Sequence, residues 1–192
     1  MKYDVILAGV GGQGVLSIAA IIARAAAEAG LSIKQSEVHG MAQRGGAVES
    51  HLRLADHPIH SDLIPTGHAD MLLAMEPMEA LRYVPFLAPS GAIVADRTQV
   101  VNIPNYPDAT EVYDALERFP CVRLVDASQI ARSLHAARAS NMALLGAASA
   151  FLPLPPADLE AAIGAIFGRK GEAVVEKNIA AFRAGREAAC GD

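Results

Sequence analysis

Apolar runs of two lengths alternate along the first two thirds of the chain. A short run between turn residues is typical of a strand, and a longer run with a helical repeat is typical of a helix. These patterns predict strands over residues 3–8, 32–38, 47–54, 69–74, 91–95 and 122–126. Helices are predicted over residues 15–29, 76–83, 128–138, 141–151, 157–167 and 172–186. Strands that alternate with helices predict an α/β fold, a three-layer α/β/α sandwich around a Rossmann-like, mostly parallel sheet.

The second and third predicted strands depart from this parallel pattern. Only residues 39–46 separate them, whereas a parallel crossover takes about a dozen residues or more. We therefore expect these two strands to pair in antiparallel fashion. No internal repeat and no sharp change of composition divides the chain, so residues 1–192 are predicted to form a single domain.

Composition and charge exclude several classes of function. The chain has 192 residues, a net charge of −5 and no stripe of basic residues, so nucleic acid is not expected as a partner. Its two cysteines, Cys121 and Cys190, form no CxxC motif, which argues against a disulfide framework and against a cysteine-ligated iron–sulfur cluster. No apolar segment has the length of a membrane span, and the first residues lack the apolar core of a signal peptide. These features predict a cytoplasmic protein without membrane contact.

The first predicted helix carries apolar residues on nearly all sides, and the C-terminal helices are rich in alanine. An apolar surface of this extent is covered either by other elements of the chain or by a partner. We therefore expect an apolar association surface, and a homodimer when the chain is isolated.

A glycine-rich turn joins the first strand to the first helix. Gly9, Gly11 and Gly14 form a GxGxxG pattern, with Gly12 and Gln13 among them. Glycines allow a tight turn, and the helix N-terminus that follows offers free N–H groups and a partial positive charge to an anion. The turn is therefore a candidate site for a nucleotide or another anion. The alternative is that the glycines only let the helix pack closely on the sheet.

The same turn also opens the dinucleotide-binding unit of nicotinamide enzymes. Glu37 stands at the end of the second strand, where such a unit places the acid that binds a ribose. However, no second crossover helix follows Glu37, and no second domain is available for a substrate. A free-standing nucleotide-binding module or an NAD(P)-linked oxidoreductase is kept as an alternative function.

The loop after the second strand reads HGMAQRGG. His39 can exchange a proton near neutral pH, and Arg44 can make a bidentate contact with a carboxylate or phosphate. Gly45 and Gly46 can adopt backbone conformations that are closed to other residues. Because such folds bind ligands at the carboxyl ends of their strands, His39, Gln43 and Arg44 are candidates for a catalytic role. The alternative is a plain connection whose polar residues face water.

Three segments resemble the gamma subunit or domain of the 2-oxoacid:ferredoxin oxidoreductases. They read GVGGQGVLSIAAIIARAA, SEVHGMAQRGGAVESHLR and SNMALLGA. The HGMAQRGG form is most similar to the beta subunit of indolepyruvate oxidoreductase. The resemblance covers nearly the whole chain.

This resemblance implies a division of labour between subunits. The family decarboxylates a 2-oxoacid on thiamine diphosphate, passes electrons through iron–sulfur clusters to ferredoxin, and transfers the acyl group to coenzyme A. The indolepyruvate type acts on arylpyruvates. Since this chain has neither a Gly-Asp-Gly…Asn motif nor a cysteine cluster, a large partner subunit is expected to hold thiamine diphosphate, magnesium and [4Fe-4S] clusters. The chain itself is expected to carry no cofactor and to be inactive alone.

The resemblance also carries over to individual residues. Candidates for cofactor binding are Gly9, Gly11, Gly12, Gln13, Gly14, Gly45 and Gly46. Candidates at the active site are His39, Gln43 and Arg44, and no residue is predicted to bind a metal. A purely structural assembly subunit is the third possible function, in which loop mutations affect assembly alone.

Two further groups of polar residues have simple interpretations. Ser140 or Asn141 is predicted to cap the helix that starts there, with a ligand contact by Asn141 as the alternative. Four histidines lack the spacing of a zinc site, so none is expected at His51, His57, His60 or His68.

Overall fold

The computed structural model describes residues 1–39 and 45–190, and a six-stranded sheet lies at its centre. The strands are β1 (Lys2–Val10), β2 (Ser32–His39), β3 (Ala47–Ala55), β4 (Ala69–Ala74), β5 (Leu87–Asp96) and β6 (Val122–Val125), in the spatial order β2-β3-β1-β4-β5-β6. β1, β4, β5 and β6 pair in parallel, whereas β3 is antiparallel to both β1 and β2. The predicted mostly parallel sheet and its antiparallel pair are confirmed.

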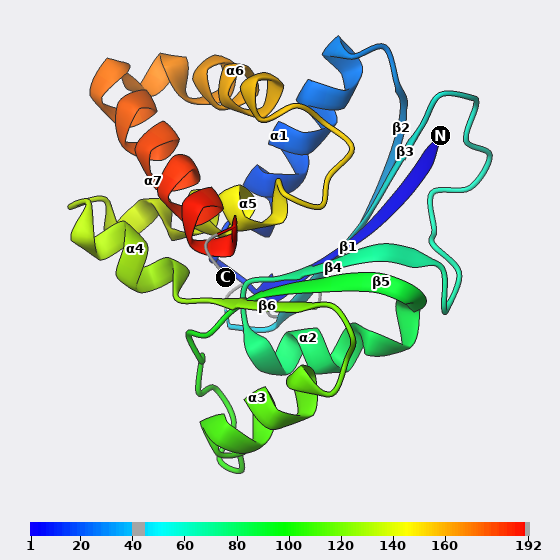
Figure 1. The fold of residues 1–192 in the computed structure, drawn as a ribbon, viewed down its shortest axis with the longest axis vertical. Helices are drawn as coiled ribbons and strands as arrows, with labels where there is room; N and C mark the ends of the chain where they lie inside the picture. Colours follow the sequence, from blue (N-terminus) through cyan, green and yellow to red (C-terminus); the bar gives the residue numbers. More distant parts are fainter. Residues whose placement is uncertain (40–44, 191–192) are drawn as a thin grey trace.

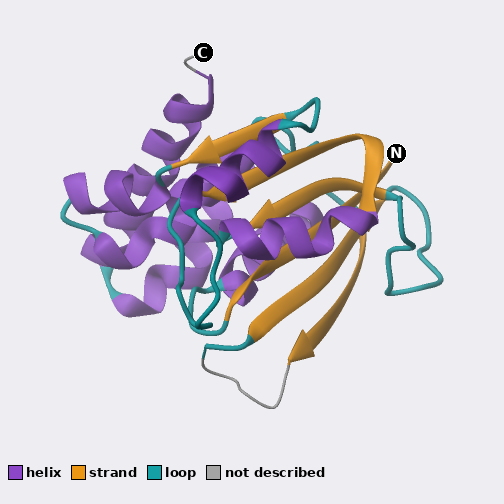
Figure 2. Cartoon of the chain, turned by 90° about the horizontal axis from the view of Figure 1, so that it is seen from below, coloured by secondary structure: helices purple, strands orange, loops and turns teal. Residues whose placement is uncertain are grey.

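Helices cover both faces of this sheet (Figure 1, Figure 2). One layer contains α1 (Val15–Glu28), α4 (Ala127–Ser133), α5 (Ser140–Ala148), α6 (Pro156–Phe167) and α7 (Glu172–Cys190). The other layer contains α2 (Pro77–Tyr83) and α3 (Ala109–Glu117). Short 3₁₀ turns lie at Val84–Phe86, Ala137–Ala139 and Gly168–Lys170. This arrangement is the predicted three-layer α/β/α sandwich.

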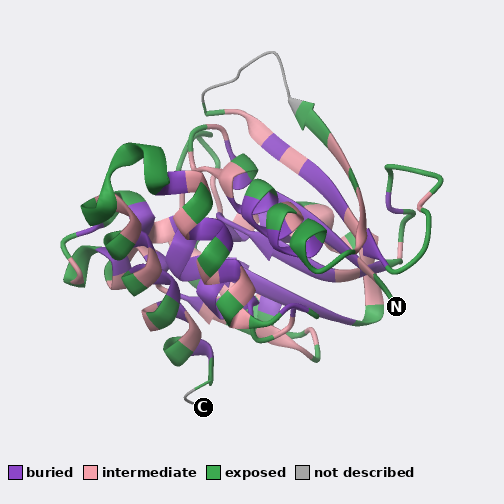
Figure 3. Cartoon of the chain, turned by 90° about the horizontal axis from the view of Figure 1, so that it is seen from above, coloured by how far each residue is buried: buried purple, intermediate pink, exposed green. Residues whose placement is uncertain are grey.

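Two apolar clusters fill the spaces between the sheet and the helix layers. Successive residues of β1 alternate between them, with Val5 and Leu7 on the α1 side and Ile6 and Ala8 on the α2 side. Because both faces are covered, the central strands are buried on both sides (Figure 3). This burial explains why these strands appear in the sequence as continuous apolar runs.

α1 is apolar on nearly all sides because other elements of the same chain cover it. It contacts α5, α6, β2 and β3, and among its large apolar residues only Leu16 is exposed. The apolar surface predicted on this helix is therefore internal, and the homodimer stays a prediction that α1 does not support. α1 ends at Glu28, one residue before the predicted limit, and Gly30 just beyond its C-cap has φ 77°, as is common after a helix end. Within the described ranges, no helix is long and apolar enough to cross a bilayer.

α5 and α7 cross in direct backbone contact at two glycines. A Cβ atom on Gly146 would lie 1.9 Å from the carbonyl oxygen of Phe182. A Cβ atom on Gly185 would lie 1.8 Å from the carbonyl oxygen of Ala143. Neither position leaves space for a methyl group, so only glycine allows the two helices to approach this closely.

Two helices differ most from the prediction. α3 lies where no helix was predicted, and Asp108 caps it by accepting a hydrogen bond from the backbone N–H of Thr110 at 2.9 Å. The helix predicted over 128–138 is too long, because α4 ends at Ser133 and His135 then takes a φ of 51°. A positive φ at a residue other than glycine interrupts an α-helix.

Candidate functional site

The carboxyl ends of β1 and β4 form the point at which the fold changes direction. β1 leads into α1 on one face of the sheet, and its parallel neighbour β4 leads into α2 on the other face. In open α/β sheets, ligands bind outside the carboxyl ends of the strands at such a switch point. The glycine turn after β1 lies at this position.

The glycine turn presents the N-terminus of α1 without a side-chain cap. Gly12 and Gly14 have φ values of 102° and 90°, which side chains disfavour. Gly14 is the N-cap of α1, and the first turn of the helix carries no acidic residue. The first N–H groups of α1 and the positive end of its dipole are therefore available to an anion. A cavity of about 450 Å³ opens here, lined by Val10, Gly11, Gly12, Gly14, Val15, Leu16 and Val48.

The end of the HGMAQRGG loop is hydrogen-bonded to this turn. The N–H of Gly11 donates to the carbonyl oxygen of Gly46 at 2.8 Å, and the N–H of Gly45 donates to that of Gly11 at 3.4 Å. Asn102 Nδ2 also donates to the Gly45 carbonyl oxygen at 2.8 Å. The structure thus brings the two glycine motifs of the sequence together.

The three candidate catalytic residues are only partly placed. His39 is the last residue of β2, where it pairs with Val48 of β3. Gln43 and Arg44 lie outside the described residues. Their roles stay predictions from the sequence.

Gln13 is engaged within the chain. Its side-chain oxygen accepts a hydrogen bond from the N–H of Val10 at 2.7 Å, and its Nε2 donates to the carbonyl oxygen of Met75 at 2.9 Å. A Cβ atom on Gly9 would lie 2.9 Å from that side-chain oxygen. Gly9 therefore leaves space for Gln13, which joins the ends of β1 and β4. Direct contact of Gly9 and Gln13 with a cofactor stays a prediction.

Asn141 lies against the glycine turn from the first turn of α5. A Cβ atom on Gly14 would lie 2.7 Å from Asn141 Nδ2. Asn141 is 8 % exposed, and its amide makes no hydrogen bond within the described part of the chain. The prediction that Ser140 or Asn141 caps this helix is wrong, because the N-cap is Ala139 and no side chain caps it. The Asn141 amide is instead available to a ligand at the turn.

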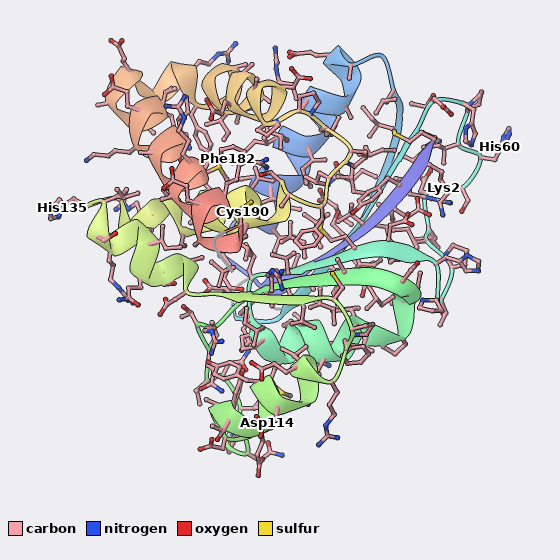
Figure 4. All side chains as sticks on the ribbon, viewed as in Figure 1. Lys2, His60, Asp114, His135, Phe182 and Cys190 are labelled. Carbon is pink, nitrogen blue, oxygen red and sulfur yellow. The ribbon has the colours of Figure 1, made fainter. Side chains whose placement is uncertain are left out.

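A second cavity, of about 560 Å³, adjoins Asn141. It is lined by Ser17, His135, Ala136, Ala137, Arg138, Ala139, Asn141, Phe167, Lys170, Val174, Lys177 and Asn178. We call it the cationic cavity, because the described residues that line it include Arg138, Lys170 and Lys177 but no carboxylate. None of these three cations forms an ion pair with another described residue. His135, one of the lining residues, lies just beyond the end of α4 (Figure 4).

Glu76 holds together the elements on the opposite side of the switch point. It is 1 % exposed, caps α2 by accepting from the N–H of Glu79 at 2.9 Å, and also accepts from the N–H of Val100 at 3.3 Å. The hydroxyl of Tyr106 donates to the same carboxylate. Burial raises the pKa of Glu79, although Arg82 beside it opposes the rise. These contacts fix the segment after β5 against α2.

Glu37 does not occupy the position of a ribose-binding acid. β3 lies between β1 and β2, so Glu37 is two strands from the glycine turn, at about 10 Å for normal strand spacing. In dinucleotide-binding folds the strand that carries this acid is the direct neighbour of β1. Glu37 accepts a hydrogen bond from Gln35 Nε2 at 2.7 Å. This geometry opposes the nicotinamide alternative.

The histidines between β3 and β4 lie at the other end of the sheet. Figure 4 shows His60 near Lys2, at the start of β1 and away from the glycine turn. His51 is buried, and its Nδ1 accepts from the N–H of Ile64 at 3.0 Å. No group of three or more His, Cys, Asp or Glu side chains in residues 1–39 and 45–190 is placed to hold a metal ion.

The sheet order, the switch point and the glycine turn define a Rossmann-like binding domain. Residues 4–188 match the family described as pyruvate ferredoxin/flavodoxin oxidoreductase. The chain belongs to this family, as the resemblance of its motifs predicts.

Three relatives define its place in the family more narrowly. Indolepyruvate oxidoreductase subunit IorB of Archaeoglobus fulgidus is 38% identical over 162 residues, which are 81% of this chain and 80% of that protein. The gamma subunit of a keto/oxoacid ferredoxin oxidoreductase from Geobacter sulfurreducens has 26% identity and a TM-score of 0.73, with 99% of both chains covered. The 2-oxoglutarate:ferredoxin oxidoreductase of Magnetococcus marinus has 25% identity and a TM-score of 0.79. The match covers the whole of this chain and 31% of the Magnetococcus chain. The chain is a small subunit of a 2-oxoacid:ferredoxin oxidoreductase.

Proposed function

We propose that this chain is the small subunit of an indolepyruvate-type enzyme and binds the phosphate groups of coenzyme A. The complex oxidatively decarboxylates indolepyruvate or other arylpyruvates to the acyl-CoA and reduces ferredoxin. A large partner subunit holds thiamine diphosphate, magnesium and [4Fe-4S] clusters. The similarity to the Archaeoglobus indolepyruvate oxidoreductase subunit supports the substrate class.

The observation that carries this proposal is the junction between the glycine turn and the cationic cavity. Coenzyme A bears a diphosphate and a 3′-phosphate, so it requires several cationic or N–H donors within one site. Gly14 and Asn141 touch where the free N-terminus of α1 meets the cavity that contains Arg138 and Lys177. Helix N-termini and guanidinium groups are the donors that phosphates favour. The Magnetococcus structure has coenzyme A bound.

The remaining lining suits the rest of a nucleotide. Phe167 and Val174 offer apolar surface to a base, and the buried Asn178 next to them donates from its Nδ2 to the carbonyl oxygen of Val174 at 2.7 Å. The volume of about 560 Å³ lies within the usual range of small-molecule sites. When bound, coenzyme A supplies the thiol that accepts the acyl group. The residues of this chain hold and orient its phosphates.

The proposal is tested by titrating coenzyme A into the isolated chain and following the heat of binding. Arg138→Ala and Lys177→Ala each remove one cation from the cavity. A charge-assisted hydrogen bond contributes about 1.5–3 kcal/mol, so each variant should bind coenzyme A about ten- to a hundredfold more weakly. Binding should also weaken as salt is added, because the contacts are ionic.

Arg118→Ala is the matched control. Arg118 is exposed at the end of α3, in the helix layer on the other face of the sheet, and does not line the cavity. This variant should bind coenzyme A as the wild type does. Failure of the wild-type chain to bind coenzyme A, or equal losses in all three variants, would refute the proposed phosphate site. A purely structural assembly subunit would give the first of these results.

A further inference from the structure

The main-chain pairing of β1 with β4 ends before the glycine turn. The last paired residues are Ala8 and Ala74, and the final main-chain bond runs from the N–H of Met75 to the carbonyl oxygen of Ala8 at 2.9 Å. Beyond this point the two strands diverge, because β1 leads into α1 on one face of the sheet and β4 leads into α2 on the other face. Continued pairing of the strands is therefore impossible here.

The side chain of Gln13 replaces the missing main-chain contact. Its amide accepts from the N–H of Val10 at 2.7 Å and donates to the carbonyl oxygen of Met75 at 2.9 Å, as a peptide group of a neighbouring strand would. Gly9 has no side chain to obstruct it, since a Cβ atom there would lie 2.9 Å from the Gln13 oxygen and 3.2 Å from Met75 Cβ. The crevice between the two strand ends is thus filled by the protein's own amide.

We propose that Gln13 is a positioning residue for coenzyme binding: it fixes the glycine turn so that Gly14 and the N-terminus of α1 meet Asn141 in the geometry that a phosphate requires. This inference rests on the proposed function. Gln13 directly precedes Gly14, where an added Cβ atom would lie 2.7 Å from Asn141 Nδ2. Gly11, on the other side of Gln13, is held by Gly46 at 2.8 Å.

The two bonds of Gln13 and the bonds of Gly11 therefore hold the turn from both sides of the switch point. Gln13 is absent from the lining of the cavity over the turn and from that of the cationic cavity. Its effect on the coenzyme must then pass through Gly14. Small displacements of the N–H donors at the turn should weaken coenzyme binding, because the strength of charge-assisted hydrogen bonds depends steeply on distance and angle.

The test compares Gln13→Glu and Gln13→Met with Gln129→Glu. Gln13→Glu keeps the shape and the acceptor for the Val10 N–H but loses the donor to the Met75 carbonyl oxygen. Gln13→Met keeps the length and loses both bonds. Gln129 is exposed on α4 and its side chain makes no hydrogen bond within the described residues, so Gln129→Glu is the matched control for the added charge.

Coenzyme A binding is measured by calorimetry on each isolated chain, after urea unfolding has shown that it is folded. Both Gln13 variants should bind about tenfold more weakly, and Gln129→Glu should bind normally. In the enzyme reconstituted with its large subunit, KM for coenzyme A should rise by a similar factor. The kcat at saturating coenzyme A and KM for the 2-oxoacid should stay at wild-type values, which a general loss of structure would not produce.

Gly9→Ala gives a second perturbation of the same turn, because the added methyl group crowds the Gln13 oxygen at 2.9 Å and Val15 Cγ2 at 3.0 Å without removing the amide. It should raise the Kd for coenzyme A in the same direction. If the wild type binds coenzyme A and all three variants at positions 9 and 13 bind within twofold of it, the positioning role is refuted and the proposed function survives. If the wild type does not bind coenzyme A, the proposed function is refuted and the positioning role falls with it.

Discussion

The glycine crossing of α5 and α7 gives the sharpest prediction about stability. In Gly185→Ala, the new methyl carbon would start 1.8 Å from the carbonyl oxygen of Ala143, and in Gly146→Ala it would start 1.9 Å from that of Phe182. Since such contacts are rarely shorter than about 3 Å, the helix axes must separate by at least about 1 Å. Both clashes involve backbone, so no rotation of a side chain can relieve them.

The cost follows from two opposing terms. Overpacking of a close-packed core costs about 1–3 kcal/mol or more, and the fully buried Phe182 loses contacts as the helices separate. Alanine favours a helix over glycine by about 1 kcal/mol, which offsets part of this loss. We therefore expect each variant to lower the free energy of unfolding by about 2 kcal/mol. The double variant should cost less than the sum, because the first separation makes space for the second methyl group.

Urea unfolding followed by circular dichroism measures these differences. The control is Gly164→Ala, since Gly164 lies within α6 and its added Cβ would have no neighbour closer than 4.0 Å. That variant should be stabilised by up to about 1 kcal/mol. Wild-type stability of both Gly146→Ala and Gly185→Ala would refute the close approach of the two helices.

Three further predictions concern the carboxyl ends of the strands. Burial raises the pKa of Asp96, so its contribution to stability is present below the unfolded pKa and is lost as the pH rises through the folded pKa. In urea unfolding at a series of pH values, Asp96→Asn should therefore gain stability relative to the wild type as the pH rises. Parallel stability profiles of the two proteins, or the same gain in the exposed Asp114→Asn, would contradict this. Gly14→Ala should lose about 1–2 kcal/mol of stability from its φ of 90°, and its methyl group, 2.7 Å from Asn141 Nδ2, should also weaken coenzyme A binding. Gly171→Ala, with φ 100° and open space around it, should share only the loss of stability that comes from φ. Arg44→Lys, reconstituted with the large subunit, should assemble normally and lose about ten- to a hundredfold in turnover, because lysine cannot form a bidentate contact. Lost assembly would place Arg44 at the subunit interface, and normal turnover would end its proposed catalytic role.

The sequence predicts the layers of the fold well because local patterns determine them. The antiparallel pairing of β2 with β3 follows from a connection too short for a crossover. α3 was missed although it has a start signal, in which Asp108 caps the helix and Glu111 follows three residues later. The order of the strands cannot be obtained in the same way, because it depends on contacts between distant segments.

In the candidate site, too, the sequence predicts the local features but not the features that depend on contacts between distant segments. The glycine turn and its helix N-terminus are visible in the sequence because both come from one short segment. The cationic cavity is not, since Arg138, Lys170 and Lys177 come from separate elements and no motif connects them. The role of Gln13 depends on Met75, 62 residues away, and its meaning appears only when β1 and β4 lie side by side.

The most direct test of the central claim is anaerobic reconstitution of this chain with its large partner subunit. Initial rates of viologen reduction are measured with indolepyruvate, pyruvate and 2-oxoglutarate at saturating coenzyme A, with and without the small chain. We predict rapid reduction with indolepyruvate, slower reduction with the other two substrates, and little activity without this chain. Equal rates with and without the chain would contradict its role in the enzyme, and a strong preference for pyruvate or 2-oxoglutarate would contradict the indolepyruvate assignment.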